Sequence, residues 1–214
     1  MRALLLALLL AAGLPVGTPA WAQTTSPPAP QAPAPSADER AVADVFAKAQ
    51  TALAQRRGAT AVGLLTTGSV ARLNAIREAA RSGDGVRLGR LEPAERFAAL
   101  GLRRHLSSSE LRRLDLGGLA DHALEKDWLG PNVIRQAALG PIRVRGDRAT
   151  ALLMVNNRPA IVQADFLREP AGWRIDLTNT LMIGNQFLKG FAAMNNKSED
   201  AYIEELLKKL PVRK

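Results

Sequence analysis

Cysteine is absent from the 214 residues of the chain, and histidine occurs only twice. The lack of cysteine excludes disulfide bonds, and it excludes a lipid-modified cysteine after the apolar N-terminal run. A metal site would need carboxylates for most of its ligands, because His105 and His122 are the only imidazoles and no ligand spacing is present. A glycine-rich phosphate loop and a nucleophile elbow are missing as well. We therefore expect neither a metal nor a cofactor.

The N-terminus has the pattern of a secretory signal peptide. A short basic start, Met1-Arg2, precedes an apolar run over residues 3–14, which is too short to span a membrane comfortably. Ala20-Trp21-Ala22 then matches the small-x-small cleavage pattern. We expect a signal peptide over residues 1–22, cleaved after its last residue, and a periplasmic or secreted mature protein.

A proline-rich stretch follows this segment. Residues 24–35 contain five prolines, which favour extended polyproline conformations and cannot donate backbone hydrogen bonds. We expect a disordered linker over residues 23–36 and a single domain over residues 37–214. The formal net charge is +9, which would suit an anionic partner. Export argues against nucleic acid, and a solvated surface of mixed charge is the simpler interpretation.

Helices are expected on both sides of a central region. Ser36 and Glu39 form a capping box at the start of the first helix, Gly58 is a plausible stop for it, and Ser198 caps the last helix. Apolar residues at helical spacing predict helices over residues 37–57, 62–81, 93–106, 116–128, 181–191 and 198–210, with a short one from Ser107. The apolar stripe expected after the central region consists of Leu181, Gly184, Leu188 and Phe191, with Phe187 beside it.

The central region, residues 141–178, predicts consecutive β-strands. The expected strands are 142–145, 149–155, 160–168 and 173–178, separated by turn residues. In the third and fourth strands apolar and polar residues alternate, which is typical of half-buried antiparallel strands. The expected fold class is α+β: several N-terminal helices packed on an antiparallel β-meander, followed by C-terminal helices.

Three segments give the chain a resemblance to the nuclear transport factor 2-like superfamily, and within it to exported bacterial members without an assigned activity. They are Gly146-Asp147-Arg148-Ala149, Phe166-Leu167-Arg168-Glu169 and Gly172-Trp173-Arg174-Ile175-Asp176-Leu177. The resemblance covers residues 38–191 and implies a curved, cone- or barrel-like sheet wrapped around helices. It implies either a binding module or an enzyme, because the superfamily hosts both. Residues 181–210 extend beyond the minimal fold, as a similar tail does in periplasmic phospholipid shuttle proteins.

The apolar face of the sheet is the first candidate site. In a cone of this kind that face would line the cavity, and none of its side chains can transfer a proton. The expected lining residues are Met154, Val162, Ala164, Phe166, Trp173, Ile175 and Leu177. Asp165 and Asp176 point to the other face unless a β-bulge reverses the alternation, in which case the enzyme hypothesis would gain support.

Four arginines in the helical region form the second candidate site. Arg103, Arg104, Arg112 and Arg113 lie close in sequence and would attract an anionic group. No aromatic residue interleaves with them, so a solvated helix face is the more ordinary interpretation. His122 borders an apolar stripe and is expected to be partly buried and hydrogen-bonded.

These patterns favour an exported, non-catalytic binding or interaction module. Its partner would be an apolar small molecule, a lipid or an envelope protein, and helices 181–210 would form a lid or plug over the cavity. One alternative is an isomerase- or dehydratase-type enzyme of the same fold. Another is a structural envelope protein attracted to anionic polymers or lipid head groups at a membrane surface.

Overall fold

The computed structural model describes residues 34–126, 128 and 136–209, apart from the side chains of Ile161 and Val162. The predicted signal peptide and most of the predicted linker lie outside these residues. The described part forms nine helices and four strands, in the order helices, sheet, helices. The helices are α1 (Ala37–Ala54), α2 (Gly58–Val62), α3 (Thr67–Ser82), α4 (Gly85–Gly89), α5 (Pro93–His105), α6 (Ser108–Arg113), α7 (Leu116–Glu125), α9 (Thr178–Met194) and α10 (Glu199–Lys209). The strands are β1 (Ala137–Arg145), β2 (Arg148–Val155), β3 (Arg158–Glu169) and β4 (Gly172–Asp176).

The four strands form one antiparallel sheet in the order β1-β2-β3-β4. Positive φ angles at Gly146, Gly172 and the pair Asn156-Asn157 close the three hairpins. Two successive positive φ angles give a turn whose twist matches that of the flanking strands. The predicted α+β class and the meander are thus confirmed, and β1 starts at Ala137 rather than at Ile142.

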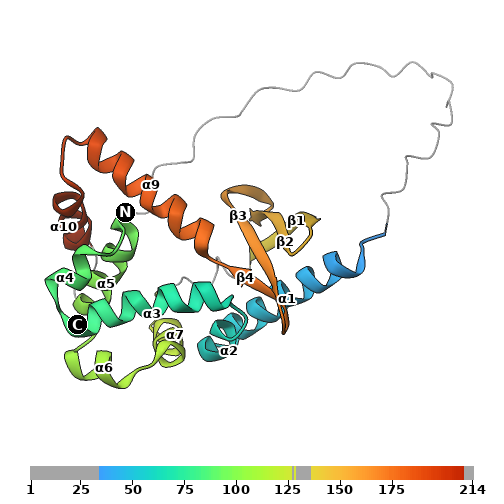
Figure 1. Cartoon of the computed structure of the whole chain (residues 1–214), viewed down its shortest axis with the longest axis horizontal. Coiled ribbons are helices and arrows are strands. Elements are labelled where there is room, and N and C mark those ends of the chain that lie inside the picture. The colour runs from blue at the N-terminus through green and yellow to red at the C-terminus, as the bar shows by residue number, and fades with distance from the viewer. Residues whose placement is uncertain (1–33, 127, 129–135, 210–214) are drawn as a thin grey trace, which may run out of the picture. The chain divides into compact units, whose positions relative to one another are not determined.

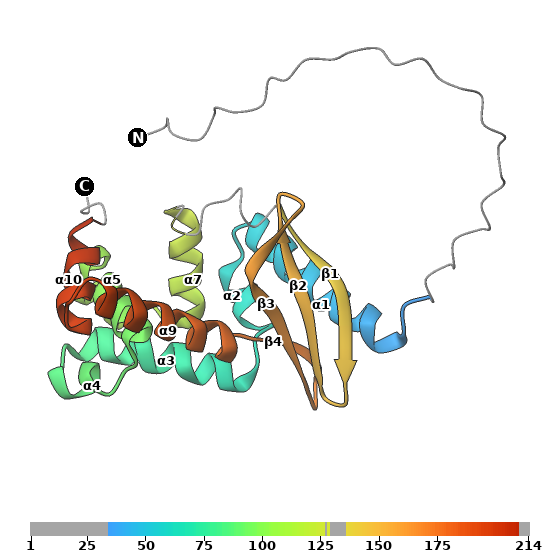
Figure 2. The ribbon, with the colours of Figure 1, turned by 90° about the horizontal axis from the view of Figure 1, so that it is seen from above.

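The predicted alternation in β3 and β4 is also confirmed. Phe166 is 2% exposed and Trp173 is 7% exposed, and both pack against Val42 and Val45 of α1. Cross-strand pairing places Phe166 opposite Ile175, so the apolar residues of the two strands share this face. Figures 1 and 2 show α1 running along the sheet, which explains why this face is covered.

A second core lies within the helical half. It joins buried residues of α3, α5, α6 and α7 with partly buried leucines around them. The buried members are Ile76, Ala79, Ala80, Ala99, Leu106, Leu111 and Leu119. The many alanines allow these helices to approach closely. In Figure 1, α9 starts where β4 ends and runs toward α10, so it connects the sheet to the helical half.

The predicted helix over residues 62–81 is interrupted at its start. Thr66 donates its backbone N–H to the carbonyl oxygen of Ile175 at 2.9 Å, and Ile175 donates to that of Leu64 at 2.9 Å. Leu65 therefore forms a parallel bridge with β4, and α3 begins only at Thr67. Pairing with the edge of the sheet satisfies the backbone groups that a continuous helix would have bonded internally. Helix propensity alone does not reveal this interruption.

Gly58 starts α2 rather than stopping the first helix, which ends at Ala54. A Cβ atom on Gly58 would lie 2.3 Å from the carbonyl carbon of Ala120 in α7. This glycine is required because α2 and α7 approach each other so closely, and not because of a left-handed cap.

The predicted stripe on α9 is only partly correct. Asn185 and Ala192 are the buried residues of this helix, while Phe191 and Phe187 are exposed. Asn185 is buried because its Oδ1 accepts a hydrogen bond at 2.9 Å from the backbone N–H of Ala94 in α5. A hydrophobic pattern could not predict this, because it counts asparagine as a surface residue.

Candidate binding pocket

Four of the residues predicted to line a cavity pack in the core beneath the sheet. Ala164, Phe166, Trp173 and Ile175 pack in one cluster with α1, whose side chains fill the space next to this face. Leu177 is the residue that precedes α9, Met154 is half-buried near Gly140, and the side chain of Val162 lies outside the described part. Four of the predicted lining residues thus contact α1, and their role in lining a binding cavity stays a prediction.

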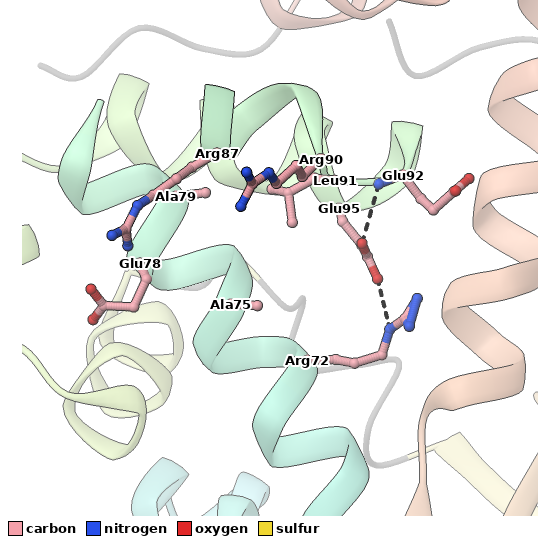
Figure 3. Close-up of a pocket in the computed structure, with 9 residues that line it drawn as sticks. All are labelled: Arg72, Ala75, Glu78, Ala79, Arg87, Arg90, Leu91, Glu92 and Glu95. Atoms are coloured by element: carbon pink, nitrogen blue, oxygen red, sulfur yellow. Dashed lines mark hydrogen bonds and ion pairs between the residues drawn. The ribbon is translucent and has the colours of Figure 1, made fainter. Parts of the chain in front are cut away.

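An open pocket of about 540 Å³ lies in the helical half, between α3 and the segment from α4 to α5. Its volume is in the range of small-molecule sites. The lining residues are Arg72, Ala75, Glu78, Ala79, Arg87, Arg90, Leu91, Glu92 and Glu95. Figure 3 shows the arginine and glutamate side chains placed around the apolar residues Ala75, Ala79 and Leu91. In that view the guanidinium group of Arg90 lies between those of Arg87 and Arg72.

Local sequence signals explain the shape of this pocket. Gly83, with φ of 65°, ends α3 in a left-handed conformation, and Asp84 caps α4 by accepting a hydrogen bond at 2.9 Å from the N–H of Val86. A capping box between Glu92 and Glu95 then starts α5. The end of α3, the whole of α4 and the start of α5 fall between Ser82 and Pro93, and these closely spaced helix termini turn the chain back over α3.

Glu95 is the buried charge of the pocket. Its side chain is 7% exposed, and its Oε1 accepts a hydrogen bond at 2.8 Å from Nε of Arg72. Its other oxygen accepts at 3.2 Å from the backbone N–H of Glu92. The carboxylate is thus compensated, as a buried charge has to be. Arg72 keeps its two terminal nitrogens without a partner among the described residues.

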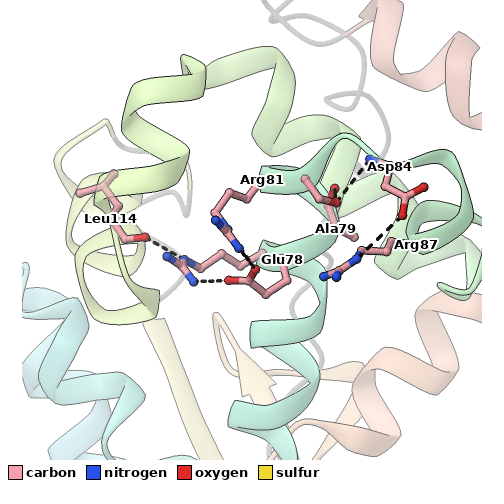
Figure 4. A network of polar contacts seen from close by, with 8 residues as sticks. Glu78, Ala79, Arg81, Asp84, Arg87 and Leu114 are labelled. Carbon is pink, nitrogen blue, oxygen red and sulfur yellow. Dashed lines mark hydrogen bonds and ion pairs between the residues drawn. The ribbon is translucent and has the colours of Figure 1, made fainter.

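Glu78 is also paired with cations. It accepts hydrogen bonds from Arg81 at 2.6 and 2.9 Å, the contact seen in Figure 4, and from Arg77 at 2.7 Å. Arg81 is the main cause of a lowered pKa of the Glu78 carboxyl, and Arg77 and Arg87 add to it. Arg77 in turn donates to the carbonyl oxygen of Leu114, so this network belongs to the packing of α3.

Glu92, at the pocket edge, forms an ion pair with Lys189 of α9 at 2.8 Å. This hydrogen bond lowers the pKa of Glu92 and raises the pKa of Lys189. Both Glu78 and Glu92 are therefore ionised near neutral pH, because an Asp or Glu carboxyl titrates near 4 even without such partners. Neither can supply a proton as a general acid.

Arg87 and Arg90 are the pocket cations that make no hydrogen bond to a carboxylate among the described residues. The nearest carboxylate oxygen to Arg87 belongs to Asp84, at 3.9 Å, which is beyond hydrogen-bond length. Arg90 is exposed and forms no ion pair within the described part of the chain. The carboxylates of the pocket thus accept hydrogen bonds from cations, while Arg90 has no ion pair in the described structure and Arg87 has only a long one, so the pocket favours an anion.

The four arginines predicted as an anionic patch do not contribute to this pocket. Arg112 and Arg113 are exposed at the end of α6, and Arg103 lies over Gly83. Arg104 is half-buried, and its Nε has no hydrogen-bond partner in the described structure. The sequence located an arginine-rich helical region correctly, but it did not show which arginines border an open space.

The two histidines meet at Trp128. The ring centroid of Trp128 lies 5.2 Å from that of His105 and 5.5 Å from that of His122, so His122 is partly buried as predicted. This contact is one of aromatic packing. Among the described residues no three His, Cys, Asp or Glu side chains are placed to hold a metal ion. No helix in the described ranges is long and apolar enough to cross a membrane.

Comparison of the chain with protein-family models, with curated proteins and with solved structures finds no match. The resemblance to the nuclear transport factor 2-like superfamily accordingly stays a prediction. The pocket residues that sequence reasoning missed are those of α4 and its flanks. The segment Val86-Arg87-Leu88-Gly89-Arg90 follows Gly83-Asp84-Gly85, which reads as a simple break. The sequence signal that could have identified them is the pair of helix caps on either side of this basic segment.

Proposed function

We propose that the protein is an exported, non-catalytic binding module that holds a small organic anion in the pocket between α3 and α5. The observation that carries this proposal is the contrast around one open space between carboxylates that accept hydrogen bonds from cations and guanidinium groups that donate none to a carboxylate. Among the described residues Arg87 has only a long ion pair with Asp84 and Arg90 has none, whereas Glu78, Glu92 and Glu95 each have a hydrogen-bonded cationic partner.

The shape and polarity of the pocket limit the class of ligand. Guanidinium groups bind carboxylate and phosphate through paired hydrogen bonds. Ala75, Ala79 and Leu91 supply a short apolar wall, which is too small for a lipid tail. A carboxylate or phosphate on a compact organic group fits this combination. Binding rather than catalysis is supported by the lowered pKa values of Glu78 and Glu92.

Calorimetric titration at low ionic strength tests the proposal, with inorganic phosphate, succinate and hexanoate as probes. We expect saturable binding of at least one probe to the mature protein. The double variant Arg87→Ala/Arg90→Ala should lose roughly tenfold or more in affinity, because each lost charge-assisted hydrogen bond is worth about 1.5–3 kcal/mol. Added salt should weaken binding in the same way, through screening.

The matched control is Arg112→Ala/Arg113→Ala, which removes the same charge from the exposed end of α6. This control should bind like the wild type. An equal loss of affinity in both double variants would show that only net charge attracts the probes. The absence of saturable binding by all three probes would also contradict the proposal.

A further inference from the structure

Several cations that compensate the acidic residues of the pocket between α3 and α5 come from outside its lining. Glu78 is paired with Arg77 and Arg81, and Glu92 is paired with Lys189 of α9. Both glutamates line the pocket, whereas none of these three cations does. The electrostatic field that a ligand meets therefore depends on charges that the ligand does not touch.

These outside partners give the pocket a positive charge balance. The charged lining residues and their ion-pair partners in the described structure comprise six cations and four carboxylates, which leaves a net charge of +2. The cations are Arg72, Arg77, Arg81, Arg87, Arg90 and Lys189, and the carboxylates are Glu78, Asp84, Glu92 and Glu95. A ligand with one negative charge leaves part of this positive charge uncompensated, whereas a dianion balances it.

The arginines of the lining also have donors for both charges of a dianion. Nε of Arg72 donates to Glu95 at 2.8 Å, which orients its guanidinium group and leaves the two terminal nitrogens without a partner among the described residues. Arg87 has only the long ion pair with Asp84, and Arg90 has none in the described structure. Arg72 belongs to α3, whereas Arg87 and Arg90 belong to α4 and its end, so these donors face one opening from two segments (Figure 3). Guanidinium groups arranged in this way can bind one doubly charged ligand together.

Lys189 keeps Glu92 from opposing such a ligand. It is the only charged residue of α9, and it donates a hydrogen bond at 2.8 Å to the carboxylate of Glu92. Figure 3 shows this carboxylate pointing away from Arg90. Without Lys189 the net charge of the same group of residues would fall to +1, because Glu92 would carry an unpaired negative charge at the edge of the pocket.

We propose that the pocket selects a dianion over a monoanion, and that Lys189 supports this selectivity through Glu92 without contacting the ligand. The inference rests on the proposed function, because it specifies the charge of the anion that the same pocket holds. Two kinds of compact ligand carry this charge. A phosphate monoester has both charges on one head group, and a short dicarboxylate has one charge at each end.

Calorimetric titration of the mature protein with probes that differ in charge tests the inference. At about pH 8 succinate carries two charges and monomethyl succinate one, and methyl phosphate carries two and dimethyl phosphate one. We expect the better of the two dianions to bind roughly tenfold or more tightly than its monoanionic counterpart. Which dianion binds better, methyl phosphate or succinate, distinguishes the two kinds of ligand. Methyl phosphate should also weaken at about pH 5, where it keeps a single charge, and dimethyl phosphate should not.

The variant Lys189→Gln tests the contribution of α9. It removes a cation that does not line the pocket, and we expect the dianion to lose roughly threefold or more in affinity and the monoanion less. The ratio of the two affinities should therefore fall, whereas damage to the structure of the pocket would weaken both probes alike. The matched control is Lys48→Gln, which breaks an exposed ion pair with Asp44 on α1 and removes the same charge from the chain. Its affinity ratio should equal that of the wild type.

Each outcome bears on a separate part of the inference. Equal affinities for dianions and monoanions would overturn it and still leave a pocket that binds anions. The absence of saturable binding by all of the probes would contradict the proposed function as well. An affinity ratio that Lys189→Gln leaves unchanged, or that Lys48→Gln lowers as much, would show that Lys189 has no part in the selectivity.

Discussion

The indole N–H of Trp173 donates a hydrogen bond to the Asp38 carboxylate at 3.2 Å, joining residues 135 positions apart. Arg168 completes this contact. Its guanidinium group pairs with Asp38 at 2.5 Å and lies 4.7 Å from the centre of the Trp173 ring. The first turn of α1 is thereby fixed to both β3 and β4. The contact holds α1 over the apolar face of the sheet.

We expect Asp38→Asn to lower the melting temperature at neutral pH. The melting temperature of the variant should also fall less than that of the wild type as the pH is lowered. The hydrogen bonds from Trp173 and Arg168 lower the pKa of Asp38 in the folded state. Their stabilisation is therefore present above the ordinary Asp pKa of about 4, and it is lost as the pH falls through the lowered value. Thermal melts between about pH 2 and pH 7 check this. Equal acid sensitivity of the variant and the wild type would contradict it.

Trp173→Phe separates the hydrogen bond from the packing. It keeps an aromatic ring in the core but removes the N–H and part of the buried indole, so we expect a loss of about 1–2 kcal/mol in the free energy of unfolding. Trp173→Ala should cost about 3–5 kcal/mol, because it also leaves a cavity. Denaturant unfolding of the two variants distinguishes the contribution of the hydrogen bond from that of the packing of the ring. Similar losses would show that the ring contributes little beyond its N–H group.

The sequence predicted Asp165 and Asp176 to be equivalent surface residues, but the structure distinguishes them. Asp176 Oδ1 accepts hydrogen bonds from Ser69 at 3.1 Å and from the backbone and hydroxyl of Thr178 at 3.0 and 2.7 Å. Thr66 approaches it at 3.5 Å, and both Thr66 and Ser69 are fully buried. Burial would raise the pKa of Asp176, but these hydrogen bonds outweigh it and the pKa is lowered.

We therefore expect Asp176→Ala to destabilise the fold by about 1–3 kcal/mol, since it leaves the buried hydroxyl group of Ser69 without its acceptor. Asp165 accepts a single bond at 3.0 Å from Asn179, and Asp165→Ala should cost only about 0.5 kcal/mol. Urea denaturation of both variants gives the comparison. A larger loss for Asp165→Ala would show that the cluster around Ser69 does not depend on the carboxylate.

Much of the fold could be predicted from the sequence, because local signals determine it. Turn residues such as Gly146 and Asn157 marked the hairpins, and the period-two pattern gave the correct core face through Phe166. The pocket could not be predicted. It depends on how α4 lies over α3, which is a matter of packing between segments, and on whether Arg90 or Arg113 has an acid near it in space.

Gly58 and Gly101 provide a test of that packing. Gly58→Ala would place a Cβ 2.3 Å from a backbone atom of α7, which requires the helices to move apart. Gly101 lies within α5 with nothing within 4 Å of its Cβ position. We expect Gly58→Ala to destabilise by about 1–3 kcal/mol through overpacking. Gly101→Ala should stabilise by about 0.5–1 kcal/mol, because alanine favours the helix. Melts in which both substitutions stabilise would contradict the close approach of α2 and α7.

The last prediction concerns the ion pair inside the pocket. Glu95 is buried, whereas the side chain of Arg72 is 45% exposed. Arg72→Ala leaves the carboxylate with only the N–H of Glu92, so we expect a loss of about 1–3 kcal/mol. Glu95→Gln removes the charge but keeps a single acceptor oxygen, so it satisfies only one of the two donors and should also destabilise the fold. In the double variant no buried charge is left unpaired, so its loss should be smaller than the sum of the two single losses.

The same two variants should move anion binding in opposite directions if the pocket is the site. Glu95→Gln removes a negative charge beside the expected anion, so phosphate or succinate should bind more tightly. Arg72→Ala removes a guanidinium group and should weaken binding. Because Glu95→Gln is expected both to destabilise the protein and to strengthen binding, a general loss of structure cannot imitate this result. Calorimetry that finds weaker binding in both variants would show that the pair shapes the pocket without contributing charge to recognition.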